Sequence, residues 1–360
     1  MKTGLKILVG VAGLAVVGLI GIKVFQKPIA MALIDRQLEQ NMGRDVIAEF
    51  PKGLHVGLCG SAGPLPNRER RAACVFVIAG DALYIVDSGA GSTGTLGSMG
   101  VQPGRVRAIF LTHFHSDHID GLGELMMNRW VQSSAQAPVP VYGPPGVERV
   151  VNGLAEAYAL DATYRTAHHG AQVVPPSGAG GSARMFDPGD DPMASKVILE
   201  EGGLTVTVFN VSHAPISPAV GYRFDYGGRS VVISGDTVPS PSVLAQAQGV
   251  DVLVHEALQN TVIERFEAKA REKGLGRMAK IMHDILDYHT SPEQAAEIAQ
   301  AAGADYLLLY HIVPPLPAFF DKAFLGDAAS RYDGPIKIGT DGFMLSLPES
   351  SDEIEARDLL

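Results

Sequence analysis

The chain has 360 residues, a hydrophobic content of 46% and a formal net charge of −10 at pH 7. After an apolar first segment about 330 residues remain, which is long for one average domain but ordinary for a two-layered α/β fold. Because the first 32 residues hold four lysines and no acidic residue, the remainder carries a charge of −14, which argues against a nucleic-acid partner.

The first segment, Leu5–Phe25, is dominated by Ile, Leu, Val, Ala and Gly and is uncharged from Ile7 to Ile22. Its length lies between the core of a signal peptide and a full membrane span, and the flanking lysines can reach the lipid interface. We expect an uncleaved membrane anchor over residues 1–32, with a removed signal peptide as the alternative. We expect the protein to be anchored in a bacterial inner membrane by a single pass, with its main domain in the periplasm. Because lysines flank the apolar segment at both ends, the opposite orientation stays open.

Only two cysteines occur, Cys59 and Cys74. They can pair if their strands are neighbours in an oxidising compartment, or each can be a small buried residue. Neither has the surroundings of a zinc ligand.

Three histidines and an aspartate occur within six residues, directly after an apolar stretch. A strand ending there would direct His113 and His115, two positions apart, into one pocket. Asp117 and His118 follow on the turn, where they can face a second ion. Imidazole and carboxylate groups suit Zn²⁺, and Mn²⁺ or Fe²⁺ can share such a site. The alternative, a solvated polar turn, rarely concentrates so many metal-binding groups.

Three further candidate ligands, His213, Asp236 and His311, come at the ends of apolar stretches rich in β-branched residues or leucine. A sheet would gather such residues along one edge. Taken singly, a histidine of this kind is more often a packed or surface residue, so the order of the whole set is the informative feature.

This ordered set resembles the metallo-β-lactamase superfamily, whose signature is His-x-His-x-Asp-His followed by a histidine, an aspartate and a histidine. The resemblance implies a dinuclear metal hydrolase with two divalent cations, Zn²⁺ in the first place. It also implies three groups of ligands: His113, His115 and His213 for the first ion; Asp117, His118 and His311 for the second; and Asp236 as the bridge.

Three other stretches narrow the resemblance to the tRNase Z-like branch, which also includes a group of arylsulfatases. They are the glycine-proline loop Leu58–Pro66 with Arg68 and Arg70, the His-Glu-Ala element His255–Ala257, and the helix-start motif His289–Ala296. Thr290 or Ser291 can cap the helix that begins at Pro292. Relatives of this branch are typically dimers, so the resemblance favours a homodimer, although the sequence itself leaves the oligomeric state open.

The resemblance and the chemistry together assign three catalytic roles. Asp117 would bind a metal ion and accept the proton of the attacking water. His289 is not needed as a ligand, so it is the candidate that donates a proton to the leaving oxygen; an ordinary helix-start histidine is the alternative. Glu256 would hold that imidazole and raise its pKa, whereas His255 would fix the loop.

The chain departs from the nuclease pattern in one segment. Bacterial tRNase Z enzymes carry an arm that grips tRNA, inserted between the third histidine motif and the bridging aspartate. Here His213 and Asp236 are joined only by a short predicted hairpin with Gly227 and Gly228 at its turn. The basic stretch Arg265–Lys280 alternates with glutamates, which is typical of a solvated helix face.

The fold class is α/β, and the resemblance implies an αββα sandwich of two central mixed sheets flanked by helices over residues 33–348. Predicted strands are Leu54–Cys59, Cys74–Ile78, Leu83–Asp87, Ala108–Thr112, Val139–Tyr142, Leu204–Val211, Ala219–Asp225, Val231–Ser234 and Asp305–His311. Predicted helices are Leu122–Gln132, Pro145–Tyr158, Val243–Gln248, Thr261–Lys273, Pro292–Ala302 and Asp321–Arg331. Residues 349–360 are an acidic tail that we expect to be frayed.

Residues 165–192 are expected to be loop throughout, since glycine, proline and aspartate recur along them. A loop of this length is functional or mobile, so we expect it to lie over the metal site and shape the substrate pocket. His168 and His169 within it are expected to be exposed.

These features favour a membrane-anchored dinuclear metal hydrolase acting on a small-molecule ester, as a phosphodiesterase or an arylsulfatase. The alternative is a tRNA 3′-processing endoribonuclease, ribonuclease Z. A lactonase or β-lactamase is a further option, and a non-catalytic binding protein is disfavoured because every ligand position is filled. Fold alone does not identify the substrate.

Overall fold

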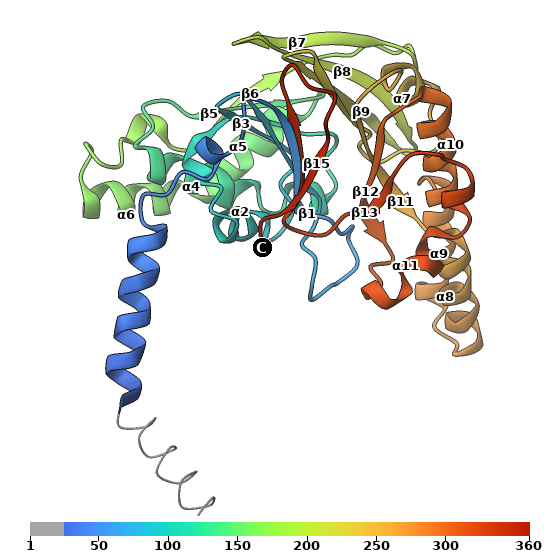
Figure 1. Ribbon diagram of the computed structural model, residues 1–360, viewed down its shortest axis with the longest axis horizontal. Coiled ribbons are helices and arrows are strands. Elements are labelled where there is room, and N and C mark those ends of the chain that lie inside the picture. Colours follow the sequence, from blue (N-terminus) through green and yellow to red (C-terminus); the bar gives the residue numbers. More distant parts are fainter. Residues whose placement is uncertain (1–24) are drawn as a thin grey trace, which may run out of the picture. The chain divides into compact units, whose positions relative to one another are not determined.

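The computed structural model describes residues 25–360 (Figure 1). Contacts divide the chain into two units, one ending at Val46 and one running from Ile47 to Leu360. In the first unit, residues 25–41 are helical and exposed. The predicted anchor over residues 1–32 lies mostly outside the described part, and no helix within residues 25–360 has both the length and the apolar character needed to cross a membrane.

Two mixed β-sheets form the centre of the second unit (Figure 1). The first has the strand order β15-β14-β1-β2-β3-β4-β5-β6, and the second has the order β13-β12-β11-β10-β9-β8-β7. The first sheet comprises β1 (Gly53–Gly60), β2 (Cys74–Ala79), β3 (Ala82–Val86), β4 (Val106–Phe110), β5 (Val139–Gly143), β6 (Gly181–Met185), β14 (Phe343–Pro348) and β15 (Glu355–Asp358). The second comprises β7 (Ser195–Glu201), β8 (Leu204–His213), β9 (Ile216–Tyr226), β10 (Arg229–Ile233), β11 (Val252–Leu258), β12 (Tyr306–Val313) and β13 (Ile336–Ile338).

Helices flank the two sheets. They are α2 (Ser92–Ser98), α3 (Ser116–Ile119), α4 (Leu122–Ser133), α5 (Val147–Ala157), α6 (Ala159–His169), α7 (Pro241–Gln246), α8 (Asn260–Glu272), α9 (Gly276–Asp284), α10 (Pro292–Ala302) and α11 (Asp321–Leu325). Short 3-10 turns are η1 (Ile47–Glu49), η2 (Pro103–Arg105), η3 (Pro176–Gly178), η4 (Ile285–Asp287), η5 (Ala318–Phe320) and η6 (Ala328–Ser330). Apolar residues of α2, α4 and α5 pack on the first sheet, and those of α7 and α10 pack on the second.

The main core lies between the two sheets. Phe110 of β4 packs against Tyr222 and Phe224 of β9, with ring centroids 5.5 and 5.6 Å apart. The parallel strands β11 and β12 are buried almost completely on both faces, and each begins with an apolar run, residues 252–254 and 306–310, before its polar residues. The predicted sandwich of two mixed sheets flanked by helices is confirmed.

Several expectations about the less apolar segments are wrong. Residues 165–192 are not loop throughout, because α6 continues to His169 and β6 adds a parallel strand beside β5. The acidic tail is not frayed, because β15 pairs antiparallel with β14. Backbone carbonyls of Ser351 and Glu353 accept hydrogen bonds from the buried guanidinium of Arg229, which ties the tail to β10.

Cys59 and Cys74 form a disulfide. They lie in β1 and β2, which are antiparallel neighbours in the first sheet, and both are fully buried. The pairing alternative is therefore the one that the structure adopts.

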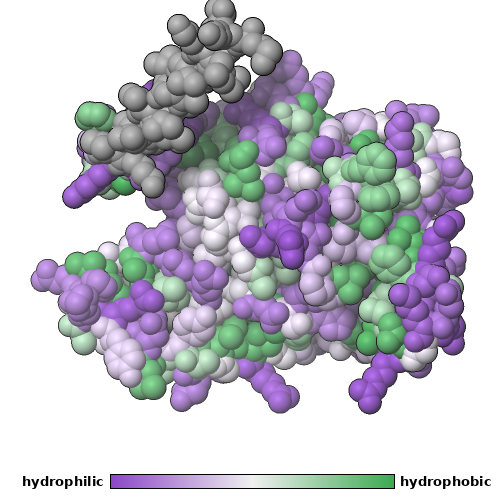
Figure 2. Space-filling model, turned by 90° about the horizontal axis from the view of Figure 1, so that it is seen from below, coloured by the Kyte–Doolittle hydropathy of each residue, from purple (hydrophilic) through white to green (hydrophobic). Residues whose placement is uncertain are grey.

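Helices α8 and α9 form a hairpin at the right-hand end of Figure 1. Three basic residues of this hairpin pair with its own acids: Lys269 with Glu272, Arg271 with Glu267, and Lys280 with Asp284. Hydrophobic and hydrophilic side chains alternate over the same end of the molecule in Figure 2. The predicted solvated helix face is confirmed.

Candidate functional site

Every candidate ligand comes from the end of a strand or from the turn that follows it. His113 and His115 follow β4, and Asp117 and His118 lie in the short helix α3. His213 ends β8, Asp236 follows β10, and His311 lies near the carboxyl end of β12. Because β10, β11 and β12 are parallel, their carboxyl ends lie at one edge of the sheet.

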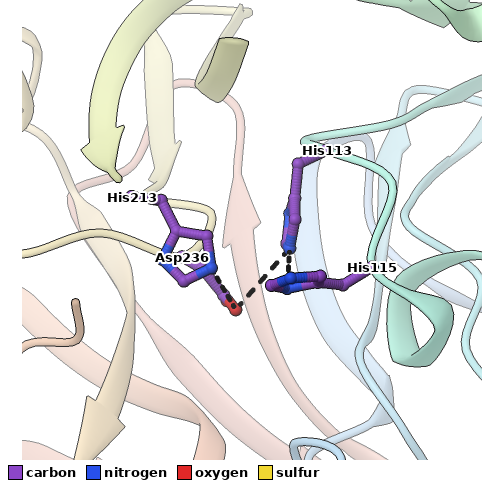
Figure 3. A group of neighbouring side chains, drawn as sticks. All are labelled: His113, His115, His213 and Asp236. Carbon is purple, nitrogen blue, oxygen red and sulfur yellow. Dashed lines mark hydrogen bonds and ion pairs between the residues drawn. The ribbon is translucent and has the colours of Figure 1, made fainter. Parts of the chain in front are cut away.

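The first ligand group combines three imidazoles with one carboxylate (Figure 3). One donor atom each from His113, His115, His213 and Asp236 lies within 4.8 Å of all the others. The Oδ2 atom of Asp236 is 3.9 Å from Nε2 of His113 and 3.8 Å from Nε2 of His213. The sequence-predicted set for the first ion is therefore brought together.

The second group, Asp117, His118 and His311, is equally compact. Nε2 of His311 is 3.1 Å from Oδ2 of Asp117, and Nε2 of His118 is 3.5 Å from the same oxygen. Asp236 joins the two groups, since its Oδ2 atom is 3.4 Å from His118 and 3.3 Å from His311. Asp236 therefore lies between the two groups, where the resemblance places its shared carboxylate.

Unpaired polar atoms show that these residues suit divalent cations. Nε2 of His118, Nε2 of His213 and Oδ1 of Asp236 are buried and lack a hydrogen-bond partner. A buried polar atom without a partner is costly, and a bound cation satisfies such atoms. The nitrogen and carboxylate donors are those that Zn²⁺, Mn²⁺ and Fe²⁺ accept, so the donor set fits two divalent ions without identifying the metal.

The protonation states of most candidate ligands also favour metal binding. Burial lowers the pKa of His113 and of His213, which keeps these imidazoles neutral. Burial opposes ionisation of Asp117, but the imidazoles of His118 and His311 outweigh it and hold the pKa of that carboxyl below its usual range. Neutral imidazoles and ionised carboxylates are the states that bind metal ions.

His118 is the exception. Burial disfavours its charged form, but the carboxylates of Asp236, Asp87 and Asp117 raise its pKa well above the ordinary value. A cation bound at His118 therefore takes the place of a proton.

Asp87, which the sequence interpretation missed, fixes two parts of the site. Its carboxylate accepts hydrogen bonds from the backbone N–H and hydroxyl of Thr112, at 2.8 and 2.7 Å, and from Nδ1 of His118 at 2.8 Å. These bonds turn Nε2 of His118 toward the other ligands. Asp87 follows the apolar strand β3 with a left-handed backbone, φ 58°, and an aspartate directly after a buried strand was the signal available in the sequence.

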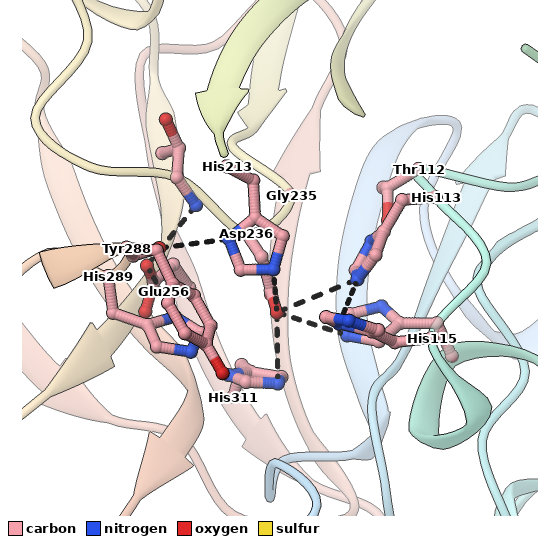
Figure 4. Close-up of polar contacts among 12 residues, drawn as sticks. Thr112, His113, His115, His213, Gly235, Asp236, Glu256, Tyr288, His289 and His311 are labelled. Carbon is pink, nitrogen blue, oxygen red and sulfur yellow. Dashed lines mark hydrogen bonds and ion pairs between the residues drawn. The ribbon is translucent and has the colours of Figure 1, made fainter. Parts of the chain in front are cut away.

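Glu256 and His289 form a buried pair beside the ligands (Figure 4). Oε1 of Glu256 accepts from Nδ1 of His289 at 3.1 Å, from the backbone N–H of Thr290 at 3.0 Å and from that of Thr237 at 3.3 Å. Burial lowers the pKa of His289, but the Glu256 carboxylate outweighs burial and raises it to about 8. Nitrogen atoms of His289 and His311 and an oxygen of Asp236 lie within 4.8 Å of one another, so this imidazole faces the site.

Two cavities open beside the ligand groups. One of about 500 Å³ is lined by His213, by residues 187–193 and by proline-rich turns. The other, of about 310 Å³, is lined by Asp117, Arg71 and the glycine-proline loop. The end of the predicted 165–192 loop thus lines a cavity at the site. His168 and His169 end α6, are exposed and line neither cavity.

The comparisons with curated proteins agree with this geometry. A family model for the β-lactamase superfamily domain matches residues 90–312. Ribonuclease Z from Mycolicibacterium gilvum is 34% identical over 291 residues, covering 80% of this chain and 94% of the relative. Ribonuclease Z from Mycobacterium marinum is 32% identical over 290 residues, covering 80% and 96%.

These relatives correct the predicted location in the bacterial inner membrane with a periplasmic domain. That location was inferred from the apolar segment Leu5–Phe25, whereas the relatives that match four fifths of the chain are ribonuclease Z enzymes. Membrane attachment, a transmembrane helix and a periplasmic domain are therefore not proposed for this protein. Among the helices of residues 25–360, none has the length and apolar character of a membrane span.

Solved structures show the same fold. The short form of human tRNase Z superposes with a TM-score of 0.58 at 21% identity, covering 82% of this chain and 99% of that one. A metallo-β-lactamase fold protein from Bacillus subtilis, YhfI, gives 0.56 at 21% identity, covering 81% and 98%. With its two ligand groups and its matched family model, the chain belongs to the metallo-β-lactamase superfamily, as a metal-dependent hydrolase whose relatives include ribonuclease Z.

Proposed function

We propose that this protein is a phosphodiesterase of the ribonuclease Z type, acting on RNA with two divalent cations, Zn²⁺ in the first place. The observation that carries the proposal is the Glu256–His289 pair beside a complete set of ligands. It is supported by the ribonuclease Z relatives, which match along four fifths of the chain.

In this mechanism the ligands divide as the resemblance implies. One ion would be held by His113, His115 and His213. The other would be held by Asp117, His118 and His311, and Asp236 would be shared by both. When bound, such a pair of cations supplies a water acidic enough to attack at neutral pH and neutralises charge on the phosphoryl group.

The side chains move the protons. Asp117, ionised and oriented by His311, accepts the proton of the attacking water. His289, charged near neutral pH because of Glu256, donates a proton to the leaving oxygen. Glu256 is a positioning residue, because it acts only through that imidazole.

A second candidate substrate class is a small phosphodiester or an aryl sulfate. Strands β9 and β10 are joined only by Gly227 and Gly228, so no arm projects at the position where bacterial tRNase Z enzymes carry one. Three cations of the α8–α9 hairpin, Lys269, Arg271 and Lys280, are also paired within it. Both features favour a substrate smaller than a folded RNA.

The test is a substrate panel with metal-loaded, full-length protein. Precursor tRNA, a chromogenic phosphodiester, an aryl sulfate and a lactone are compared with and without chelator. Cleavage of precursor tRNA that chelator abolishes supports the first proposal, whereas turnover of the small esters alone supports the second candidate. Hydrolysis of neither phosphodiester would overturn both phosphodiesterase proposals.

Matched histidine variants identify the proton donor in the same assay. His289→Ala is expected to lose about 100- to 10,000-fold in rate while keeping its metal content. His168→Ala removes an exposed histidine at the end of α6 and is expected to behave as the wild type.

A further inference from the structure

We propose that the hydroxyl group of Tyr288 donates a hydrogen bond to a non-bridging oxygen of the phosphodiester. This inference rests on the proposed function and names a further residue for its reaction. Tyr288 follows the turn η4 and directly precedes His289, so the chain delivers it to the site together with the proton donor.

Two histidines of the site hold the Tyr288 ring. Its centroid is 4.8 Å from that of His213, at an interplanar angle of 71°, and 4.7 Å from that of His289, at 40°. The backbone carbonyl of Tyr288 also accepts a hydrogen bond of 2.9 Å from Nδ1 of His213. Ring and backbone are therefore both fixed by residues that face the substrate.

The hydroxyl is directed into the site and is free to bind a ligand. In Figure 4 it points away from the Tyr288 backbone, toward the side on which His289 and His311 lie. Within residues 25–360 it has no hydrogen-bond partner, and the side chain is half-buried. The carboxylates of Asp236 and Asp117 act on it electrostatically, which places it in the field of both ligand groups.

The chemistry of the reaction assigns this hydroxyl to a non-bridging oxygen. His289 already serves the leaving oxygen, and Asp117 serves the attacking water. The non-bridging oxygens of a phosphodiester carry negative charge throughout the reaction and need donors that are fixed in advance. A neutral phenol on a held ring is such a donor, and one donor of this kind typically contributes about 100- to 1,000-fold in rate.

The first experiment compares Tyr288→Phe with the wild type on bis(4-nitrophenyl) phosphate, using metal-loaded, full-length protein. The ring contacts survive, so metal content is expected to stay within about two-fold, while KM rises about 5- to 20-fold and kcat falls about 10- to 100-fold. Tyr164→Phe makes the same change at an exposed position of α6 and is expected to leave kcat unchanged. A Tyr288→Phe variant with wild-type kcat overturns the proposal.

A second comparison separates a non-bridging oxygen from the leaving oxygen. Phosphodiesters with 4-nitrophenyl and with phenyl leaving groups are cleaved by both variants, Tyr288→Phe and His289→Ala. The Tyr288→Phe loss is expected to be the same for the two substrates, whereas the His289→Ala loss grows with the poorer leaving group. A Tyr288→Phe loss that grows in the same way overturns the assignment to a non-bridging oxygen.

Binding of inorganic phosphate to the metal-loaded protein provides a readout that is independent of turnover. Calorimetry is expected to show an affinity about 5- to 20-fold weaker for Tyr288→Phe than for the wild type. If the wild type cleaves no phosphodiester but this difference appears, the proposed function fails and the Tyr288 contact stands. Equal phosphate affinities overturn the contact.

Discussion

At the residue scale, this site depends on side chains that fix other side chains. Asp87 sets the direction of His118, the Tyr288 carbonyl sets that of His213, and Glu256 sets that of His289. A buried imidazole otherwise has two tautomers and a rotating ring, and the second hydrogen bond selects one arrangement. Changing one of these partners should therefore alter the site without removing a ligand.

Glu256→Gln should change the pH dependence of hydrolysis. The Glu256 carboxylate raises the pKa of His289 to about 8, and an amide supplies no charge while burial continues to lower that pKa. A general acid works in its protonated form, so activity is lost as pH rises through its pKa. In the pH profile of kcat/KM, we expect the fall in activity at alkaline pH to move to lower pH by about one unit or more.

The informative contrast is between two pH values. At pH 6 the variant should recover much of the wild-type rate, and at pH 8 it should not. An equal loss at both values would mean that Glu256 supports the fold of the Thr237 and Thr290 loops rather than the charge on His289.

Gly63→Ala should weaken the metal site through His311. A Cβ atom at Gly63 would lie 2.8 Å from Cε1 and 3.0 Å from Nε2 of that imidazole, and 2.7 Å from a methyl group of Val313. The ligand has to shift, so we expect zinc affinity about 10- to 100-fold lower in a competition titration with a chromophoric chelator. Gly94→Ala in α2 meets nothing within 4 Å and should bind zinc as the wild type does.

At the element scale, the sequence could predict the strands that carry ligands because they are apolar and end in histidine or aspartate. Strand β12 reads as an apolar run up to Tyr310 because it is buried on both faces, whereas β11 is not among the predicted strands because His255 and Glu256 interrupt its apolar residues. Strands β6 and β7 lie at sheet edges, with mostly exposed or half-exposed residues, so no periodic pattern marked them. Tyr288 could not be assigned either, because its role depends on ring contacts across the fold rather than on a motif.

Deleting residues 349–360 should destabilise the protein and leave hydrolysis intact. The deletion removes β15 from β14 and takes carbonyl acceptors at Ser351 and Glu353 from the buried guanidinium of Arg229. We expect a loss of about 1–3 kcal/mol, seen as a lower thermal midpoint. The tail contributes no ligand, so kcat at 25 °C should not change; a truncated protein with wild-type stability and a reduced kcat would contradict this account.

At the scale of the whole molecule, the ligand cluster links the two sheets. Asp117 and His118 follow β4 of the first sheet, whereas His213 and His311 belong to strands of the second. Cations bound between them would therefore join the two halves of the sandwich, and would also satisfy buried atoms for which residues 25–360 offer no other partner. Metal binding should thus act on global stability as well as on the reaction.

Removing metal should lower the thermal midpoint, and by more at pH 8 than at pH 6. Protons compete with cations for imidazoles, and the raised pKa of His118 makes this competition strong near neutral pH. The proton on His118 stabilises the metal-free fold fully below pH 6.5, and this stabilisation is lost as pH rises through the folded pKa of His118. Over the same range of pH the affinity of the site for zinc increases, because fewer protons compete for the imidazole. At a free concentration about 1,000-fold above Kd, each ion contributes about 4 kcal/mol. Thermal scans with zinc and with chelator measure this difference in thermal midpoint. The difference should nearly vanish in Asp236→Ala and persist in His169→Ala. A difference that is larger at pH 6 than at pH 8 would contradict metal binding through these imidazoles.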